Sequence, residues 1–141
     1  MTDNDEMALN SGVSAFEAKH FSRAMQLLAP LAEAGNAEAQ YRMAIMTQNG
    51  LGMVRNAERA VNYMRAAAEQ EQPYAQHGLG FMYLEGDCVD KDETVAVDWF
   101  KRAAANGMIG SAATLGRMYD EGLGVEKNPE EAQKWYKQAG F

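Results

Sequence analysis

Few residues in this chain have the types and spacing that catalysis or metal binding requires. The two histidines, His20 and His77, lie 57 positions apart, with no cysteine or carboxylate at metal-ligand spacing. The single cysteine, Cys88, has no histidine near it in the sequence that could activate its thiol. We therefore expect no metal site and no catalytic nucleophile, and we expect that the chain is not an enzyme.

Two further patterns are interpreted as structural. The pairs Gly50-x-Gly52 and Gly122-x-Gly124 lack the preceding strand and the third glycine of a phosphate-binding loop. The adjacent carboxylates of Glu130 and Glu131 fall in a predicted first helical turn, where negative charge offsets the helix dipole. We expect no bound cofactor.

Composition narrows the classes of partner. A chain of 141 residues with 47% hydrophobic content can bury the core of one domain. Its net charge of −7 disfavours nucleic acid and anionic membranes, because both attract clustered lysine and arginine. No apolar run reaches the roughly eighteen residues of a membrane span, so we expect no membrane insertion.

The N-terminus is acidic and is not followed by an apolar run, so it is not a secretory signal. We therefore expect a cytoplasmic location if the chain is full length, and a periplasmic or secreted one if a signal peptide was removed. One cysteine cannot form an internal disulfide, so stability must come from packing.

The element that organises the chain is a repeat of 36 residues, the kind of feature that should be sought before any other. Four columns with offsets of 0, 3, 4 and 7 follow the buried stripe of an amphipathic helix. They read Ala24, Ala60, Ala96, Ala132; Leu27, Tyr63, Trp99, Trp135; Leu28, Met64, Phe100, Tyr136; and Leu31, Ala67, Ala103, Ala139.

A second set of columns, upstream of the first, has offsets of 0, 4 and 8 and predicts another helix. These columns read Ala39, Ala75, Ser111; Met43, Leu79, Leu115; and Thr47, Tyr83, Tyr119. Each unit thus contains a first helix, A, and a second helix, B. A single pair cannot bury its apolar face alone, so the pairs must stack.

The junctions between A and B carry the residues that end and start helices. Gly50, Gly86 and Gly122 stand where helix A should end in a left-handed conformation. Helix B should then begin at the N-caps Asn56, Asp92 and Asn128, with Pro129 at the first helical position of the last unit. In the middle junction Cys88 replaces the second glycine, which leaves the backbone of that loop in question.

These residues resemble the Sel-1-like repeat family, a relative of the tetratricopeptide repeat. The resemblance rests on Ala75, Leu79-Gly80, Tyr83, Gly86, Val89, Asp92, Ala96, Trp99-Phe100, Ala103-Ala104 and Gly107, and on the matching unit from Leu115 to Gly140. It implies an all-α, right-handed α-α superhelix of about eight helices in four pairs. The first full unit departs most, with Ala44, Thr47 and Glu71 where the family favours Gly, Tyr and Gly.

We predict a single solenoid domain over residues 1–141, with repeats at 37–72, 73–108 and 109–141. Residues 4–36 are interpreted as a tetratricopeptide-like capping unit with helices near 4–18 and 20–34. Its loop is about four residues shorter, because Gly12 to Ala24 spans 12 residues and Gly80 to Ala96 spans 16. The final helix, with Trp135 and Phe141, has no helix after it to cover it.

In tetratricopeptide-like solenoids the A helices line the concave groove, and here the A-helix face opposite the core is apolar over much of its length. Such a patch is typical of an interaction surface. The residues predicted to contact a partner are Leu9, Val13, Phe16, Tyr41, Ile45, Gln48, Tyr74, His77, Phe81, Leu84, Arg117 and Asp120. The alternative is that neighbouring A helices bury these residues against one another.

The leading hypothesis is a non-catalytic adaptor that binds a peptide or helix of a partner protein. The resemblance implies roles in signalling, secretion, envelope regulation or host interaction, most often in bacteria. Two alternatives stay open. One is β-lactam binding or hydrolysis, associated with family members that carry paired cysteines in every repeat. The other is a homo-oligomer formed through the C-terminal helix.

Overall fold

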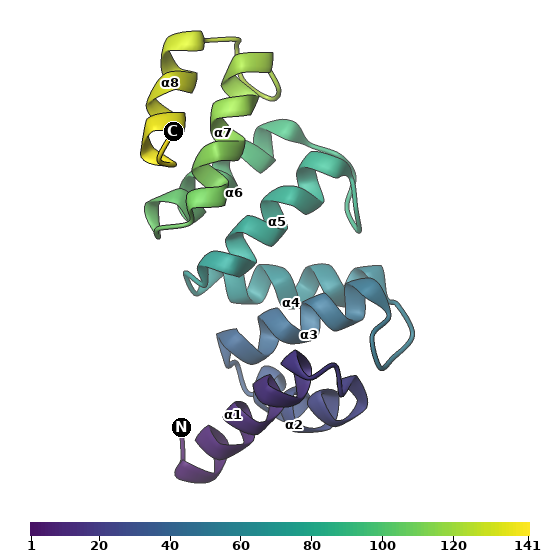
Figure 1. Cartoon of the computed structure of the whole chain (residues 1–141). Helices are drawn as coiled ribbons and strands as arrows, with labels where there is room; N and C mark the ends of the chain where they lie inside the picture. The colour runs from purple at the N-terminus through teal and green to yellow at the C-terminus, as the bar shows by residue number, and fades with distance from the viewer. The chain divides into compact units, whose positions relative to one another are not determined.

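The computed structural model describes all 141 residues and consists of eight α-helices without any strand (Figure 1). The helices are α1 (Asp3–Glu17), α2 (Phe21–Glu33), α3 (Ala37–Asn49), α4 (Ala57–Glu69), α5 (Pro73–Glu85), α6 (Glu93–Ala105), α7 (Ile109–Glu121) and α8 (Pro129–Gln138). The odd-numbered helices are the predicted A helices, and the even-numbered helices are the B helices. The predicted all-α class and the four helix pairs are confirmed.

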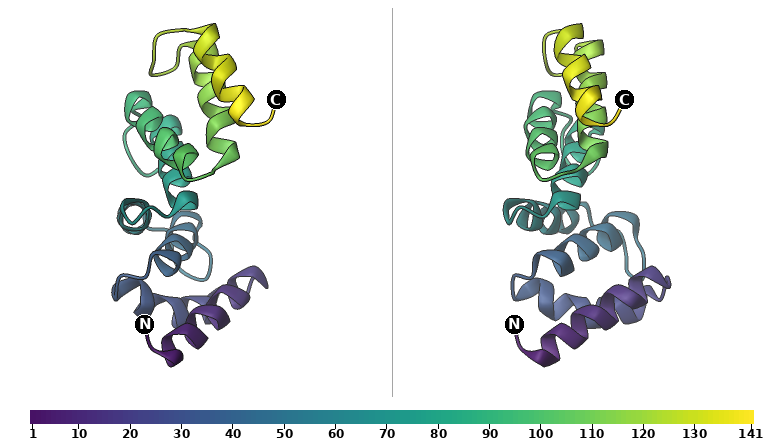
Figure 2. Two further views of the ribbon diagram at one scale, coloured as in Figure 1. Left: turned by 90° about the vertical axis from the view of Figure 1, so that its left-hand side faces the viewer. Right: turned by 60° about the vertical axis from the view of Figure 1, so that its left-hand side comes forward.

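The helices fall into two compact units, residues 1–70 and residues 71–141. Within each unit every A helix packs against the B helix that follows it, and the first B helix packs against the second A helix. Figure 2 shows one such pair, α7 and α8, side by side in both views. The single continuous domain over 1–141 remains a prediction.

The predicted junctions are confirmed at the level of individual caps. The side chains of Asn56, Asp92 and Asn128 accept hydrogen bonds from the third backbone N–H of their helices, at 3.0, 3.2 and 3.1 Å. Each bond satisfies a donor that the helix itself leaves unpaired. At the other end of each loop, Gly50, Gly86 and Gly122 have φ of 67°, 71° and 72°, the left-handed conformation of a C-cap.

The loop with Cys88 keeps the geometry of its two counterparts. Cys88 has φ of 67°, close to the 72° and 70° of Gly52 and Gly124 at the same register. A side chain in this conformation is strained, because its Cβ crowds the backbone. The cysteine therefore changes the chemistry of the loop and not its path.

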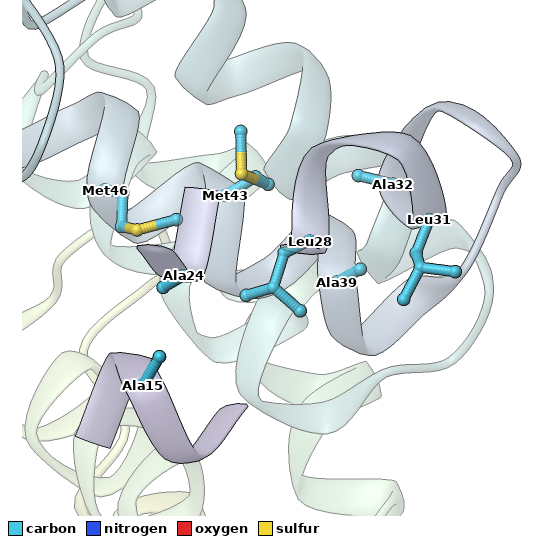
Figure 3. Close-up of a cluster of buried hydrophobic side chains, with 8 residues drawn as sticks. All are labelled: Ala15, Ala24, Leu28, Leu31, Ala32, Ala39, Met43 and Met46. Carbon is cyan, nitrogen blue, oxygen red and sulfur yellow. The ribbon is translucent and has the colours of Figure 1, made fainter. Parts of the chain in front are cut away.

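The core of the first unit forms where α1, α2 and α3 meet (Figure 3). Leu28 and Ala24 on α2 are fully buried, and Met43 and Met46 on α3 are 2% and 0% exposed. The alanine lets the helices approach closely, while the long methionine side chains fill the remaining irregular space.

In the second unit the core runs from α5 through α6 to α7. It consists of Leu84, Ala96, Val97, Phe100, Ala104, Ala112, Leu115 and Met118. Phe81 and Trp135 pack against this cluster from its edges and are partly buried. None of the eight helices has both the length and the hydrophobicity needed to span a bilayer.

Candidate interaction surface

The predicted face of α5 begins with an exposed aromatic side chain. Tyr74 is 57% exposed, and His77 and Phe81, which follow it at helical spacings of three and four residues, are half-buried. The ring centroids of His77 and Phe81 lie 4.9 Å apart in an edge-to-face arrangement. The three side chains thus form one aromatic strip along α5.

Residues of α6 and α7 contact the buried side of the strip at His77 and Phe81. Phe81 and His77 lie edge-to-face with Phe100 of α6, with centroids 5.0 and 5.7 Å apart. His77 Nδ1 is 2.6 Å from Oγ of Ser111, the third residue of α7. These contacts bury part of the His77 and Phe81 rings and fix their orientation, so this part of the strip is preformed.

Leu84 does not belong to this surface. It is 7% exposed and is a member of the core cluster of the second unit, so almost none of its side chain is available to a partner. The sequence-based assignment therefore needs correction at this residue. Leu84 packs in this cluster with residues of α6 and α7, so here the alternative of burial between helices applies.

The predicted residues of α7 are polar and engaged with their own unit. Arg117 Nε is 3.0 Å from Glu121 Oε2, one helical turn away, in an exposed ion pair. Asp120 accepts a hydrogen bond from the Tyr136 hydroxyl at 3.4 Å. Burial, followed by the charge of Asp120, raises the pKa of Tyr136 above its ordinary value. This side of α7 offers charge and hydrogen bonds to a partner and no apolar anchor.

In the first unit the residues of α1 are half-buried. Leu9 and Phe16 pack against the core cluster, and Phe16 also meets Phe21 of α2 edge-to-face at 5.7 Å. Val13 lies between them on the same face and is likewise half-buried. Each of these side chains is thus only partly buried, and its contact with a partner remains a prediction.

Arg42 organises the junction between α1 and α3. Its guanidinium lies 4.9 Å from the ring of Phe16 and 5.8 Å from that of Tyr41, and Nε is 2.9 Å from Glu38 Oε1. Arg42 Nη2 is also 3.9 Å from Oε1 of Glu17, the last residue of α1. Because the Arg42 guanidinium on α3 contacts both the ring of Phe16 and the carboxylate of Glu17 on α1, it links the two helices.

The remaining predicted residues of α3 are accessible in part. Ile45 and Gln48 are half-buried. The Gln48 backbone carbonyl accepts a hydrogen bond from Arg55 Nη1 at 2.8 Å, which fastens the end of α3 to its loop. The structure thus brings Phe16 and Tyr41 together around Arg42, and it brings Tyr74, His77 and Phe81 together along α5.

Sequence reasoning missed a pair of buried amide bridges. Gln40 accepts a hydrogen bond from Gln70 at 2.8 Å, and Gln76 accepts one from Asn106 at 2.9 Å. Both acceptors are at least nine-tenths buried, so an unpaired amide would be destabilising there. The 36-residue register itself contained the signal, because it aligns Gln40 with Gln76 and Gln70 with Asn106.

The Ser111–His77 contact has the residue types of a nucleophile and its base. Ser111 is fully buried, however, so its hydroxyl oxygen cannot meet a substrate. No group of three or more histidine, cysteine, aspartate or glutamate side chains is placed to hold a metal ion. The geometry supports recognition of a partner better than it supports chemistry.

A shallow, open pocket of about 460 Å³ lies between α1 and α2, and its α1 residues are on the side of that helix opposite Leu9 and Val13. Ser11, Ser14, His20 and Arg23 are among the residues that line it. When Gly12 is aligned with Ala44, the two serines take the places of Met43 and Met46, which are buried in α3. A polar outer side is what a capping unit requires, and we retain that role for residues 4–36 as a proposal.

Comparison with known proteins agrees with this architecture. The Sel1 repeat model matches residues 37–71, 73–108 and 111–140. No curated protein matches the chain significantly. Among solved structures, a Sel1 repeat protein from Oxalobacter formigenes is 33% identical, with a TM-score of 0.86 over 92% of this chain and 54% of its own.

Two further structures are similar to the chain. A protective antigen present in uropathogenic Escherichia coli strains, which displays an SLR fold, is 32% identical with a TM-score of 0.90 over 96% of this chain and 30% of its own. Cysteine-rich protein B of Helicobacter pylori shares the fold at 22% identity, with a TM-score of 0.65 over 84% of each chain. The chain thus spans about half or less of the first two relatives.

Proteins built from Sel1 repeats are generally protein-interaction modules. The three repeat matches cover well over half of the 141 residues, and the departures at Ala44, Thr47 and Glu71 do not interrupt them. The chain therefore belongs to the Sel1 repeat family.

Proposed function

We propose that this chain is a non-catalytic interaction module that binds a peptide or helix of a partner protein on the face of α5. The observation that carries the proposal is the aromatic strip, in which Tyr74 is 57% exposed while His77 and Phe81 are anchored beneath it. Aromatic side chains that are rigid before binding give up little conformational entropy when a partner covers them.

The surroundings of the strip favour an apolar ligand at its N-terminal end. Ile109, at the start of α7, is 65% exposed. Gly110 beside it has no side chain, and a Cβ built there would lie 3.4 Å from His77 Cε1. A small residue next to the ring leaves the edge of His77 accessible, so a partner side chain can lie between Tyr74 and α7.

The C-terminal end of the same helix favours a basic residue on the partner. Glu85, the last residue of α5, is exposed, and the whole chain has a net charge of −7. We therefore infer a ligand with two apolar residues one helical turn apart, followed by a lysine or arginine that reaches Glu85. Charge complementarity of this kind raises the association rate and fixes the orientation.

Selection from a peptide-display library with the full chain as bait tests the proposal. We expect enriched peptides that combine two apolar residues, three or four positions apart, with a basic residue. Tyr74→Asp should weaken the binding of these peptides at least about tenfold, equivalent to roughly 1.4 kcal/mol. Phe81→Asp is a poorer probe, because Phe81 is also packed against the core.

Val54→Asp provides the matched control. Val54 is 89% exposed in the loop between α3 and α4, so the same change in charge leaves α5 untouched. It should bind the selected peptides as the wild type does. Failure to enrich any peptide, or equal binding by Tyr74→Asp and the wild type, would contradict the proposal.

A further inference from the structure

His77 occupies an unusual place for an ionisable side chain. Its ring is half-buried, with Phe81 and Phe100 at 4.9 and 5.7 Å between ring centroids. Its Nδ1 is 2.6 Å from Ser111 Oγ. With the imidazole neutral, the serine hydroxyl can donate to Nδ1, and both polar groups are satisfied in an apolar setting.

Ser111, which forms this bond with His77, departs from the pattern of the repeat. At the position of Ser111 the other repeats have Ala39 and Ala75, and all three residues are fully buried. A hydroxyl introduced into a buried alanine column requires a hydrogen-bond partner. His77 is that partner, so the Ser111–His77 pair is confined to the junction of α5 with α7.

The position of the ring relative to α7 also disfavours a positive charge. Gly110 and Ser111, which lie against His77, are the second and third residues of α7, at the positive end of its dipole. The N-cap, Met108, supplies no side-chain acceptor to offset that end. Protonation would place an imidazolium beside the first turn of the helix, at the positive end of its dipole.

Nearby charges do not compensate for this placement. Burial lowers the pKa of His77 below its ordinary value, and no charged group adds to or opposes that shift. The charged side chains of the three helices around the ring are Glu85 on α5; Glu93, Asp98, Lys101 and Arg102 on α6; and Arg117, Asp120 and Glu121 on α7. No ion pair joins any of them to His77.

We propose that His77 is an acid-sensitive switch for the α5 surface. When His77 is protonated, Nδ1 carries a hydrogen and can no longer accept from the Ser111 hydroxyl, so the neutral-state bond is lost. The charged ring then moves away from the N-terminal turn of α7, and the aromatic strip loses its support. A partner that covers His77 binds the neutral form, so acidification releases it. This last step rests on the proposed function, whereas the change in the α5–α7 contact does not.

NMR titration of the full chain between pH 7.5 and 4.5 tests the switch without a ligand. The chain has only two histidines, so in the His20→Gln variant the one remaining histidine signal belongs to His77. We expect His77 to titrate below the ordinary histidine pKa of about 6.5. The amide signals of Tyr74, Phe81 and Gly110 should move with the same midpoint, and in His77→Gln they should not.

Ser111→Ala is the matched variant, because alanine occupies this column in the other repeats. It should shift the titration of His77 toward the ordinary value and leave helicity unchanged. The switch is overturned if His77 titrates at or above about 6.5. It is also overturned if the α5 and α7 signals do not follow His77, or if they move equally in His77→Gln.

A binding arm uses a peptide selected as described above. Relative to its own affinity at pH 7.5, the wild type should lose up to about tenfold in Kd per pH unit below the His77 midpoint. The His77→Gln variant should lose less. Equal losses in both proteins overturn the release step, whereas failure of any peptide to bind at neutral pH contradicts the proposed function and leaves the titration as a separate test.

Discussion

At the scale of single residues, Glu71 shows how a departure from the family pattern is accommodated. Glu71 has φ of 63°, and the positions 36 residues before and after it, Gly35 and Gly107, have φ of 101° and 90°. A side chain in the left-handed region is strained. The carboxylate offsets that strain by accepting hydrogen bonds from Gln76, Arg102 and Asn106.

These donors make the stability of the second unit depend on pH. They lower the pKa of Glu71, with Gln76 as the largest cause, followed by Arg102 and Asn106. The carboxylate's contribution is therefore complete above the unfolded-state pKa of about 4.3, and it is lost as the pH falls through the lower folded-state pKa. Glu71→Gln should lower the urea midpoint at pH 7, and the difference from wild type should shrink below about pH 4.

Glu69→Gln is the control for this prediction, since Glu69 is exposed at the end of α4 and has the same change in charge. Its urea midpoint should follow the wild type from pH 7 to pH 3. If the difference in urea midpoint between Glu71→Gln and wild type stays constant with pH, the Glu71 carboxylate is not the group whose titration changes the stability.

At the scale of helices, each A helix crosses its B helix at a small residue that faces a large one. A Cβ built on Gly80 would lie 2.7 Å from the Phe100 ring, and one on Gly116 would lie 2.6 Å from the Tyr136 ring. In the same register the first full repeat pairs Ala44 with Met64, which are 0% and 1% exposed. Where the repeat has alanine in place of glycine, the side chain opposite it is thus the narrower and more flexible methionine in place of phenylalanine.

This pairing predicts a compensating double substitution. Gly80→Ala should lower the free energy of unfolding by about 1–3 kcal/mol, because the rigid Phe100 ring cannot yield to the new methyl group. Adding Phe100→Met reproduces the Ala44–Met64 pair. The double variant should then be more stable than the sum of the two single effects by about 1 kcal/mol or more, as measured by urea unfolding in a double-mutant cycle.

If the effects of Gly80→Ala and Phe100→Met on the free energy of unfolding simply add, the two residues are not tightly packed against each other. The alignment with Ala44 and Met64 would then not predict which pairs of side chains are compatible. The control is Gly110→Ala. Gly110 is also helical, but a Cβ there meets only His77 at 3.4 Å, which is ordinary van der Waals contact. It should change stability far less than Gly80→Ala.

Helix boundaries were accessible to sequence reasoning because local chemistry sets them. Asn56, Asp92 and Asn128 cap their helices as predicted, since a short polar side chain can reach the third N–H only from that position. Side-chain networks are harder to predict, because the register aligns the amide residues of the repeats without showing which of them are hydrogen-bonded to one another. Gln76 looks like a surface residue until Glu71 and Asn106 are known to lie beside it.

At the scale of the whole molecule, each unit has its own core, so damage should remain local. Leu115 is fully buried in the core of the second unit, and Leu115→Ala should destabilise that unit by about 2–5 kcal/mol. Hydrogen exchange should then accelerate most in α5 to α8, and least in α1 and α2, as expected when a repeat protein is stabilised by nearest neighbours.

The mirror control is Leu28→Ala, which removes a fully buried leucine from the core of the first unit. It should accelerate exchange most in α1 to α3. If either substitution accelerates exchange uniformly over all eight helices, the two units unfold as one, and the local account fails.

The sequence predicts which residues share the candidate face of α5, but it does not predict how deeply each of them is buried. A helical wheel places Tyr74, His77, Phe81 and Leu84 on one face, but it cannot say how far that face turns into a neighbouring helix. The structure leaves Tyr74, near the N-terminal end of α5, exposed, whereas Leu84 packs with residues of α6 and α7 in the core of the second unit. Only the packing of three helices decides which residues remain for a partner.

The most direct test of the account is a chemical-shift map of the full chain with a peptide selected by display. We expect the largest changes at Tyr74, His77 and Phe81, with smaller ones at Ile109 and Gly110, and none at Val54. Changes centred on the B helices, or on the cavity lined by Ser11, Ser14 and Arg23, would contradict the assignment of binding to α5.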